Sequence, residues 1–136
     1  ESTLQISHAA LENALTTLAD KQVLQQQTGA VHAAAWCEKD GKVQFIREDV
    51  GRHNALDKLL GAANELGKTE GFVLVTSRAS YEMVYKVASA NIALLASVSA
   101  PTSLAIELAD QCGLTLIAFT RPGRHVVYSG PQRLLS

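Results

Sequence analysis

Three short, continuous apolar segments constrain the fold of this chain more than any other feature of its sequence. They are residues 71–77 (GFVLVTS), 92–100 (IALLASVSA) and 113–120 (GLTLIAFT), and each has the length and composition of a buried strand. Residues 80–90 and 101–112 lie between them and carry apolar residues at helical spacing. Apolar strands that alternate with helices are typical of a largely parallel sheet with helices on both faces.

The rest of the chain predicts a helix, a hairpin, a second helix and an edge strand. Apolar residues recur at helical spacing within residues 7–27. Residues 30–37 (AVHAAAWC) and 42–48 (KVQFIRE) flank the turn signal EKDG, which indicates a β-hairpin. Residues 54–66 resume the helical spacing, and residues 125–129 (HVVYS) are typical of a short edge strand. We therefore expect an α/β fold with a mixed, mostly parallel sheet and helices on both faces.

The composition places these elements in one compact unit. At 136 residues the chain fits a single domain, which we expect over residues 28–136, preceded by an N-terminal helical segment at residues 1–27. With 12 lysines and arginines against 13 acidic residues, no overall charge favours binding to nucleic acid or to a membrane, and no apolar run is long enough to span a bilayer. Cys37 and Cys112 have neither CxxC nor metal-type spacing, so we expect a reducing, cytoplasmic location.

Four polar segments directly follow predicted strands. They are residues 47–54 (REDVGRHN), 76–80 (TSRAS), 98–103 (VSAPTS) and 119–125 (FTRPGRH). In parallel sheets ligands bind at the carboxyl ends of strands, where helix N-termini present free backbone N–H groups, so we expect these segments to converge on one edge. The candidate binding residues outside the last segment are His32, Asp49, Arg52, His53, Asn54, Asp57, Arg78 and Ser80.

The last segment has the clearest pattern for binding an anion. Arg121 and Arg124 lie on either side of a Pro-Gly turn, an arrangement that suits two guanidinium groups clamping phosphate oxygens. The alternative is a solvated turn before an edge strand. Near the first segment, Asp49 and Asp57 could orient an arginine or accept a hydrogen bond from an amino or hydroxyl group of a ligand.

Each of the other candidates also has a structural interpretation. Ser80 and Asn54 stand where helix caps are expected, and His53 is either a general base or a hydrogen-bonded structural residue. His32 lies between small residues on a predicted strand, where an inward-facing structural role is equally open. We expect Cys37 to be a buried apolar residue rather than a nucleophile, since no base is evident near it.

The order of helices and strands is similar to that of zinc-dependent deaminases, but the zinc ligands are missing. Those enzymes pair an H-x-E motif at one strand-to-helix junction with P-C-x-x-C at the next. The corresponding stretches here are RHNA (52–55) and RASY (78–81), which lack the glutamate and both cysteines. We therefore expect no metal site and no zinc.

Five longer stretches are specific enough to indicate a family. They are TGAVHAAAWC, REDVGRHNALDKLLG, GFVLVTSRASYEMVYKVA, LLASVSAPTSLAIELA and GLTLIAFTRPGRHVVY. Together they resemble the C-terminal portion of the FdhD family, the accessory sulfurtransferases of formate dehydrogenase, over about residues 28–128.

This resemblance implies a cytidine-deaminase-like core without zinc, and a specific task. Members of the family accept sulfur from a cysteine desulfurase as a persulfide and pass it to the bis-guanine-dinucleotide molybdenum cofactor, before that cofactor enters formate dehydrogenase. The stretch FTRPGR matches the cofactor-binding segment, which implies contacts from Phe119, Thr120, Arg121, Pro122, Gly123 and Arg124, with GDP as a partial mimic. The local chemistry agrees, because phosphates suit arginines and a flat guanine suits an aromatic ring.

One departure from the family pattern limits what this chain can do. The sulfur-carrying cysteine of the family belongs to a CxxC motif upstream of the TG segment, and no cysteine precedes Thr28 here. We therefore expect the chain to supply the cofactor-binding domain of a sulfurtransferase whose N-terminal domain and persulfide cysteine lie outside it. We assign no catalytic residue to the chain, and in particular we do not assign Cys37 as the sulfur-carrying cysteine.

Two other functions stay open on the sequence alone. One is a zinc-free, nucleotide-processing enzyme that uses His53 and Asp57 for acid–base work, although nothing in the sequence would activate an electrophile for it. The other is an interaction module that docks the desulfurase or the dehydrogenase without touching cofactor. A homodimer is compatible with the sequence, because the edge strand at 125–129 and the N-terminal helix would both need covering.

Overall fold

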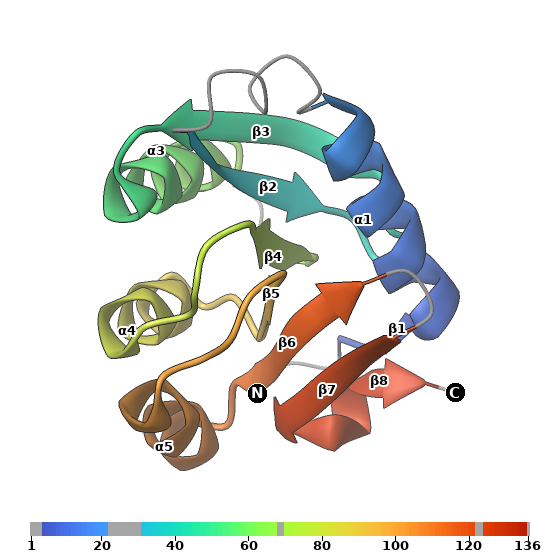
Figure 1. Cartoon of the computed structure of the whole chain (residues 1–136), viewed down its shortest axis with the longest axis vertical. Helices are drawn as coiled ribbons and strands as arrows, with labels where there is room; N and C mark the ends of the chain where they lie inside the picture. The colour runs from blue at the N-terminus through green and yellow to red at the C-terminus, as the bar shows by residue number, and fades with distance from the viewer. Residues whose placement is uncertain (1–3, 22–30, 68–69, 122–123, 136) are drawn as a thin grey trace.

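The computed structural model describes residues 4–21, 31–67, 70–121 and 124–135, which form one main sheet between layers of helices (Figure 1). The described elements are β1 (Ile6–Ser7), α1 (His8–Lys21), β2 (His32–Cys37), β3 (Val43–Asp49), α3 (Arg52–Glu65), β4 (Phe72–Val75), α4 (Tyr81–Ser89), β5 (Leu94–Ser97), α5 (Ser103–Cys112), β6 (Thr115–Arg121), β7 (Arg124–Ser129), the 3₁₀ turn η1 (Pro131–Arg133) and β8 (Leu134–Leu135).

The main sheet has six strands in the order β3-β2-β4-β5-β6-β7. β4, β5 and β6 pair in parallel, but β2 is antiparallel to both of its neighbours and β7 is antiparallel to β6. Among the described strands, three of the five ladders in the main sheet are therefore antiparallel, so the expectation of a mostly parallel sheet is wrong, whereas the mixed character is confirmed. The reason is that the hairpin inserts its more apolar strand, β2, between β3 and β4. Residues 33–37 of β2 are buried, and the half-exposed β3 takes the edge.

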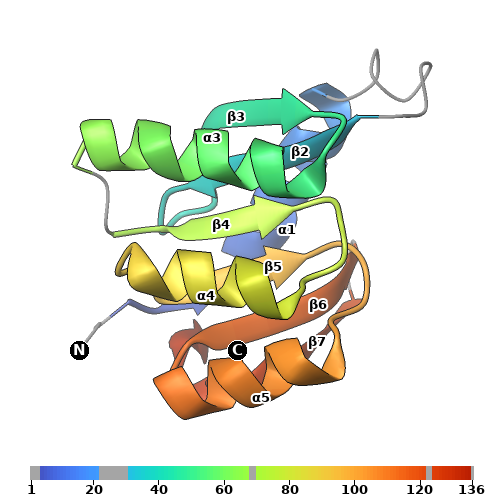
Figure 2. The same ribbon diagram turned by 90° about the vertical axis from the view of Figure 1, so that its left-hand side faces the viewer.

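Two antiparallel pairings in succession leave β3 pointing the same way as β4, β5 and β6. The carboxyl ends of these four strands lie along one edge of the sheet, at the right in Figure 2 and towards the viewer in Figure 1. β2 and β7 begin at the same edge, because they run in the opposite direction. We call this the carboxyl edge.

Helices cover both faces of the sheet, as the sequence predicts. α3, α4 and α5 pack side by side on one face, and α1 packs on the other (Figures 1 and 2). The first layer encloses a core that includes Trp36, Leu59 and Met83, and the second layer encloses one that includes Leu11 and Phe72. All five side chains are fully buried, so each face of the sheet contributes its own apolar core.

The hairpin and the helix after it show how local sequence sets these elements. The turn at residues 38–41 needs Gly41, whose φ is +89° and whose position leaves no room for a Cβ beside the backbone of Ala10. α3 begins at Arg52, two residues before the predicted start, with the extended Gly51 as its N-cap. Asn54 is therefore not a cap, and that interpretation is wrong, because the chain already turns into the helix at Gly51.

The two ends of the described chain meet in a short ladder that the sequence pattern did not indicate. β1 and β8 pair in parallel, with Ile6 opposite Leu134. Two-residue strands carry too little periodicity to be recognised. The predicted helix at 7–27 is confirmed as α1 up to Lys21, and its remainder lies outside the described residues. Within the described ranges, no helix is both long and apolar enough to cross a membrane.

Candidate ligand-binding site

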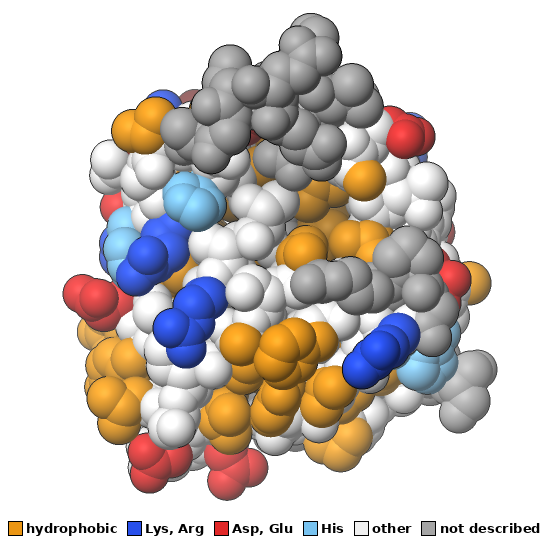
Figure 3. Space-filling view, viewed as in Figure 1, with side chains coloured by type: hydrophobic (Ala, Val, Ile, Leu, Met, Phe, Trp, Pro, Cys, Tyr) orange, Lys and Arg blue, Asp and Glu red, His pale blue; other side chains and the backbone are white. Residues whose placement is uncertain are grey.

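The four polar segments of the sequence lie together at the carboxyl edge. Each follows β3, β4, β5 or β6, whose carboxyl ends share this edge. Figure 3 looks onto the edge and shows basic side chains on either side of a group of apolar ones. The predicted convergence is therefore confirmed for the described parts of these segments. A face of this kind can present cations and an apolar surface to one ligand.

Phe119 presents an aromatic ring at this edge through an unusual backbone. Its φ is +54°, a left-handed value that only Asn91 shares among the described non-glycine residues. Its side chain is 40% exposed, and its ring lies 6.5 Å from the ring of Tyr128 between centroids. The ladder between β6 and β7 is irregular at this point. Bulky residues rarely adopt this conformation unless their surroundings hold it, and it often occurs at functional sites.

The rest of the expected cofactor-binding segment is partly described. Arg124 is exposed at the start of β7 and lies opposite Arg121 in the sheet register. Thr120 is buried, so its side chain is not on the exposed surface of the edge. Pro122, Gly123 and the side chain of Arg121 lie outside the described residues, so the pairing of two arginines around the turn stays a prediction.

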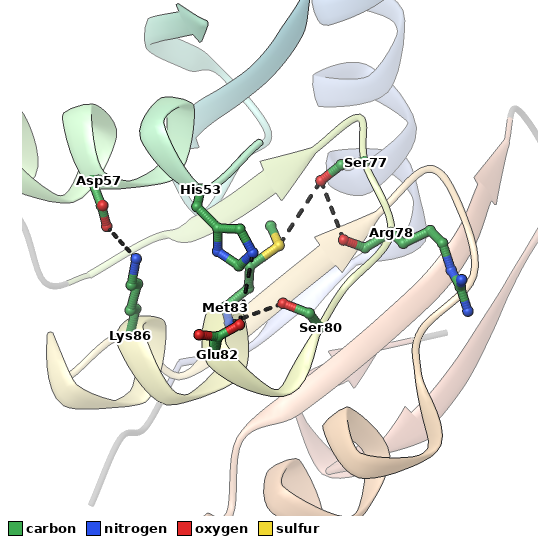
Figure 4. A network of polar contacts seen from close by, with 8 residues as sticks. All are labelled: His53, Asp57, Ser77, Arg78, Ser80, Glu82, Met83 and Lys86. Atoms are coloured by element: carbon green, nitrogen blue, oxygen red, sulfur yellow. Dashed lines mark hydrogen bonds and ion pairs between the residues drawn. The ribbon is translucent and has the colours of Figure 1, made fainter. Parts of the chain in front are cut away.

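The loop after β4 adds an exposed arginine. Arg78 is exposed, and Figure 4 shows its side chain extending away from the contacts between α3 and α4. Ser80 accepts a hydrogen bond from the backbone N–H of Met83 at 3.3 Å, so its interpretation as a helix cap is confirmed. Arg78 is thus available to a ligand, whereas the Ser80 hydroxyl serves the helix.

The loop after β3 is held by a carboxylate, that of Asp49, which already pairs with a lysine and accepts a backbone hydrogen bond. Asp49 Oδ2 lies 2.8 Å from Lys58 Nζ, and Asp49 Oδ1 accepts the backbone N–H of Gly51 at 3.0 Å. These contacts, with a further hydrogen bond from Asn54, lower the pKa of Asp49 to about 2, the bond from Gly51 being the largest cause. Asp49 is therefore better suited to holding the loop than to accepting a ligand hydrogen bond.

His53 and Asp57 both face α4 rather than each other. His53 Nε2 lies 3.9 Å from Glu82 Oε1, and one turn further along, Asp57 Oδ1 lies 2.9 Å from Lys86 Nζ (Figure 4). These contacts tie the two helices together. They do not form the acid–base pair that a nucleotide-processing enzyme would need.

The remaining candidates, His32 and Arg52, also lie at the carboxyl edge. His32 is half-buried at the start of β2, opposite Asp49 in the sheet register. Next to it, the backbone N–H of Ala33 donates to Thr76 Oγ1 at 3.0 Å, which connects the start of β2 to the end of β4. Arg52 is exposed at the first position of α3. The structure thus brings His32 and Arg52 to the edge without showing a ligand role for either.

The two cysteines lie away from this edge. Cys37 is buried at the far end of β2, and burial raises the pKa of its thiol, so its interpretation as a core residue is confirmed. Cys112 is exposed, but it ends α5, a helix that starts at the carboxyl edge and carries the chain about 15 Å away from it. Within the described ranges, no group of three or more His, Cys, Asp or Glu side chains is arranged to hold a metal ion.

Sequence reasoning missed a set of serine contacts beneath the edge. Ser97, at the end of β5, is fully buried, and its hydroxyl contacts the backbone of both Ser77 and Ser99. A single serine at the end of an apolar strand gives no periodic signal. Only the spatial meeting of the loops after β4 and β5 shows what it joins.

Comparisons with known proteins agree with one another. The FdhD/NarQ family matches residues 1–135. The chain is 59% identical over 136 residues to the sulfur carrier protein FdhD of Xanthomonas campestris pv. campestris (strain B100), covering 98% of this chain and 48% of that protein. It is 58% identical over 126 residues to the sulfur carrier protein FdhD of Cupriavidus necator, covering 91% of this chain and 44% of that protein. The chain thus spans about half the length of these curated relatives.

A solved structure shares the fold. The crystal structure of a formate dehydrogenase accessory protein from Desulfotalea psychrophila superposes with a TM-score of 0.90 and 34% sequence identity. The match covers 98% of this chain and 58% of that one. The α/β architecture described above is therefore also seen in an experimental structure of a relative.

Proposed function

The chain belongs to the FdhD/NarQ family, and on that premise we propose that it forms the substrate-binding half of a sulfur carrier protein serving formate dehydrogenase. In this proposal the carboxyl edge binds a guanine nucleotide moiety of the bis-guanine-dinucleotide molybdenum cofactor. The cofactor is the substrate of sulfur transfer, not a group that stays with the protein. The sulfur comes from a cysteine desulfurase, and the transfer takes place in the cytoplasm.

The observation that carries this proposal is the exposed ring of Phe119 at an edge that also bears cationic side chains. Its left-handed backbone turns an apolar ring towards solvent at an edge that also bears Arg78 and Arg124. A planar base stacks on an aromatic ring, and guanidinium groups bind phosphate oxygens through charge-assisted hydrogen bonds. An aromatic ring and two arginines at one edge therefore suit a nucleoside diphosphate, which has both a planar base and phosphates, better than a ligand that has only one of these.

The sulfur-carrying thiol is proposed to lie outside these residues. Persulfide transfer needs an exposed thiolate, which attacks the terminal sulfur of the desulfurase persulfide while the desulfurase cysteine leaves as a thiolate. Cys37 is buried with a raised pKa, and Cys112 lies at the other end of α5 from the carboxyl edge. Neither is placed to receive sulfur and deliver it to a ligand at this edge, which supports a sulfur-carrying cysteine outside these residues.

The nucleotide-processing alternative is weakened by the contacts of its two proposed residues. Asp57 pairs with Lys86, and His53 faces Glu82, so neither is free to share a proton with the other. An interaction-only module would differ from our proposal in one measurable respect, because it would not bind nucleotide.

Titration of the purified chain with GDP by isothermal calorimetry tests the proposal. We expect binding by the wild type, and an affinity about tenfold lower in Phe119→Ala because one base–aromatic stack is lost. Tyr85→Ala is the matched control, since Tyr85 is an exposed aromatic residue on the outer side of α4. No binding by the wild type, or equal affinity in Phe119→Ala and the wild type, would contradict the proposed role of this edge.

A further inference from the structure

We propose that Ser97 is a positioning residue that holds Phe119 in its ligand-facing conformation, an inference that rests on the proposed function above. Ser97 is the last residue of β5, and its side chain is 0% exposed. It cannot touch a ligand at the surface of the edge. Any effect of its hydroxyl on binding must therefore pass through the backbone groups that it contacts.

The Ser97 hydroxyl joins two loops of the carboxyl edge. Its Oγ lies 2.6 Å from the carbonyl oxygen of Ser77 and 3.0 Å from that of Ser99, and it accepts the backbone N–H of Ser99 at 3.1 Å. A hydroxyl has one proton to donate, so the shorter contact identifies the Ser77 carbonyl as the main acceptor. The turn that contains Ser99 is thereby fixed against the loop after β4.

Ser99 in turn fixes the backbone of Phe119. The N–H of Phe119 donates to the carbonyl oxygen of Ser99 at 3.1 Å. A non-glycine residue with a φ of +54° persists only where its neighbours hold it, and this hydrogen bond is one such constraint. Ser97 accepts the N–H of the same residue, Ser99, so it contributes to the position of this acceptor and connects the buried hydroxyl to the exposed ring through a single residue.

The rest of the edge does not depend on Ser97 to the same degree. The backbone N–H of Ala79 donates to Ala100 at 3.3 Å, and the N–H of Thr102 donates to Ala79 at 2.9 Å. These bonds join the loops after β4 and β5 without the Ser97 hydroxyl. Its removal should therefore release Phe119 more than it releases Arg78, and should affect recognition of the base more than recognition of phosphate.

The experiment compares Ser97→Ala with Ser129→Ala. Ser129 is also a buried serine, and its hydroxyl donates to the Leu114 carbonyl at 2.9 Å, but it lies at the opposite edge of the sheet. We expect Ser97→Ala to bind GDP about five- to tenfold more weakly, the value of one hydrogen bond, while its affinity for inorganic pyrophosphate changes less than about twofold. Ser129→Ala should bind both ligands like the wild type, although both variants lose similar thermal stability.

A second measurement needs no ligand. Amide hydrogen exchange at Phe119 should become about tenfold faster in Ser97→Ala and stay unchanged in Ser129→Ala, because only the first variant loosens the acceptor of that N–H. Unchanged exchange at Phe119, or equal loss of GDP affinity in the two variants, would overturn the inference. Failure of the wild type to bind GDP would count against the proposed function instead, and the exchange rates would still decide whether Ser97 positions Phe119.

Discussion

The carboxylate of Asp49 lies 2.8 Å from the ammonium group of Lys58, and this contact ties the end of β3 to the second turn of α3. Together with the hydrogen bond from Gly51, it lowers the pKa of Asp49 to about 2. The loop between them leads into α3, whose first two residues, Arg52 and His53, lie near the carboxyl edge. The ion pair therefore fixes the side of the site that lies next to α3.

This contact predicts a specific response to acid. A carboxyl group whose pKa is lower in the folded state than its ordinary value of about 3.9 stabilises the fold above that value, and the stabilisation is lost as the pH falls towards 2. We expect Asp49→Asn to have a lower Tm than the wild type at pH 6 and to lose less of its Tm between pH 5 and pH 2. Thermal denaturation across this pH range measures both effects. Asp110→Asn, on the exposed side of α5, should follow the wild type.

A second prediction concerns the turn that lets α1 pack on the hairpin. Gly41 has a left-handed φ, and a Cβ at this position would collide with the backbone of Ala10, so Gly41→Ala should destabilise the chain by about 2 to 4 kcal/mol. Gly61→Ala is the matched control, because Gly61 lies within α3 with no neighbour in the way. It should stabilise the chain by about 0.5 to 1 kcal/mol. Urea unfolding of both variants provides the comparison, and a mild effect at Gly41 would contradict the packing described here.

A third prediction tests the cationic side of the carboxyl edge. Arg124→Ala should weaken GDP binding by about 1.5 to 3 kcal/mol, because it removes a charge-assisted contact with phosphate. Lys39→Ala is a suitable control, since Lys39 is exposed in the hairpin turn at the other edge of the sheet. Calorimetric titrations at two salt concentrations separate direct contact from general charge. Equal losses in the two variants would point to general charge alone.

A fourth prediction concerns the thiols. Cys112 should react quickly with a thiol reagent such as Ellman's reagent, and Cys37 only after unfolding, because the first is exposed and the second is buried. Incubated with a cysteine desulfurase and radiolabelled cysteine, the chain should keep no stable label, whereas a longer chain that includes an upstream CxxC should be labelled. Label that disappears in Cys37→Ala would show that the working thiol lies within these residues.

The sequence predicted the features that depend on local pattern and strand direction. The apolar segments at 71–77, 92–100 and 113–120 became β4, β5 and β6, and the loops after them met at one edge because those strands are parallel. That rule of topology is general, so the placement of Arg78 and Phe119 at this edge followed from the order of elements alone.

The features that the sequence could not predict depend on contacts between distant residues. The alternating pattern of residues 42–48 does not predict that β2 lies between β3 and β4. The order of pairing depends on which of the two hairpin strands gains more from burial on both faces. The contact between Ser97 and Ser77 has the same origin, because it exists only after two loops have met. The left-handed backbone of Phe119 is likewise imposed by its neighbours, since a phenylalanine does not favour that conformation by itself.

The ladder between β1 and β8 has a consequence for the order in which the molecule opens. Ile6 pairs with Leu134 through only two residues on each strand, and these partners are about 130 residues apart in the sequence, so the contact forms only after the segments between them are in place. The parallel pairings at the centre of the sheet each join neighbouring βαβ units and close much shorter loops. The β1–β8 ladder should therefore form after the six-stranded sheet and open before it, with the burial of Ile6 holding the ladder in the folded state.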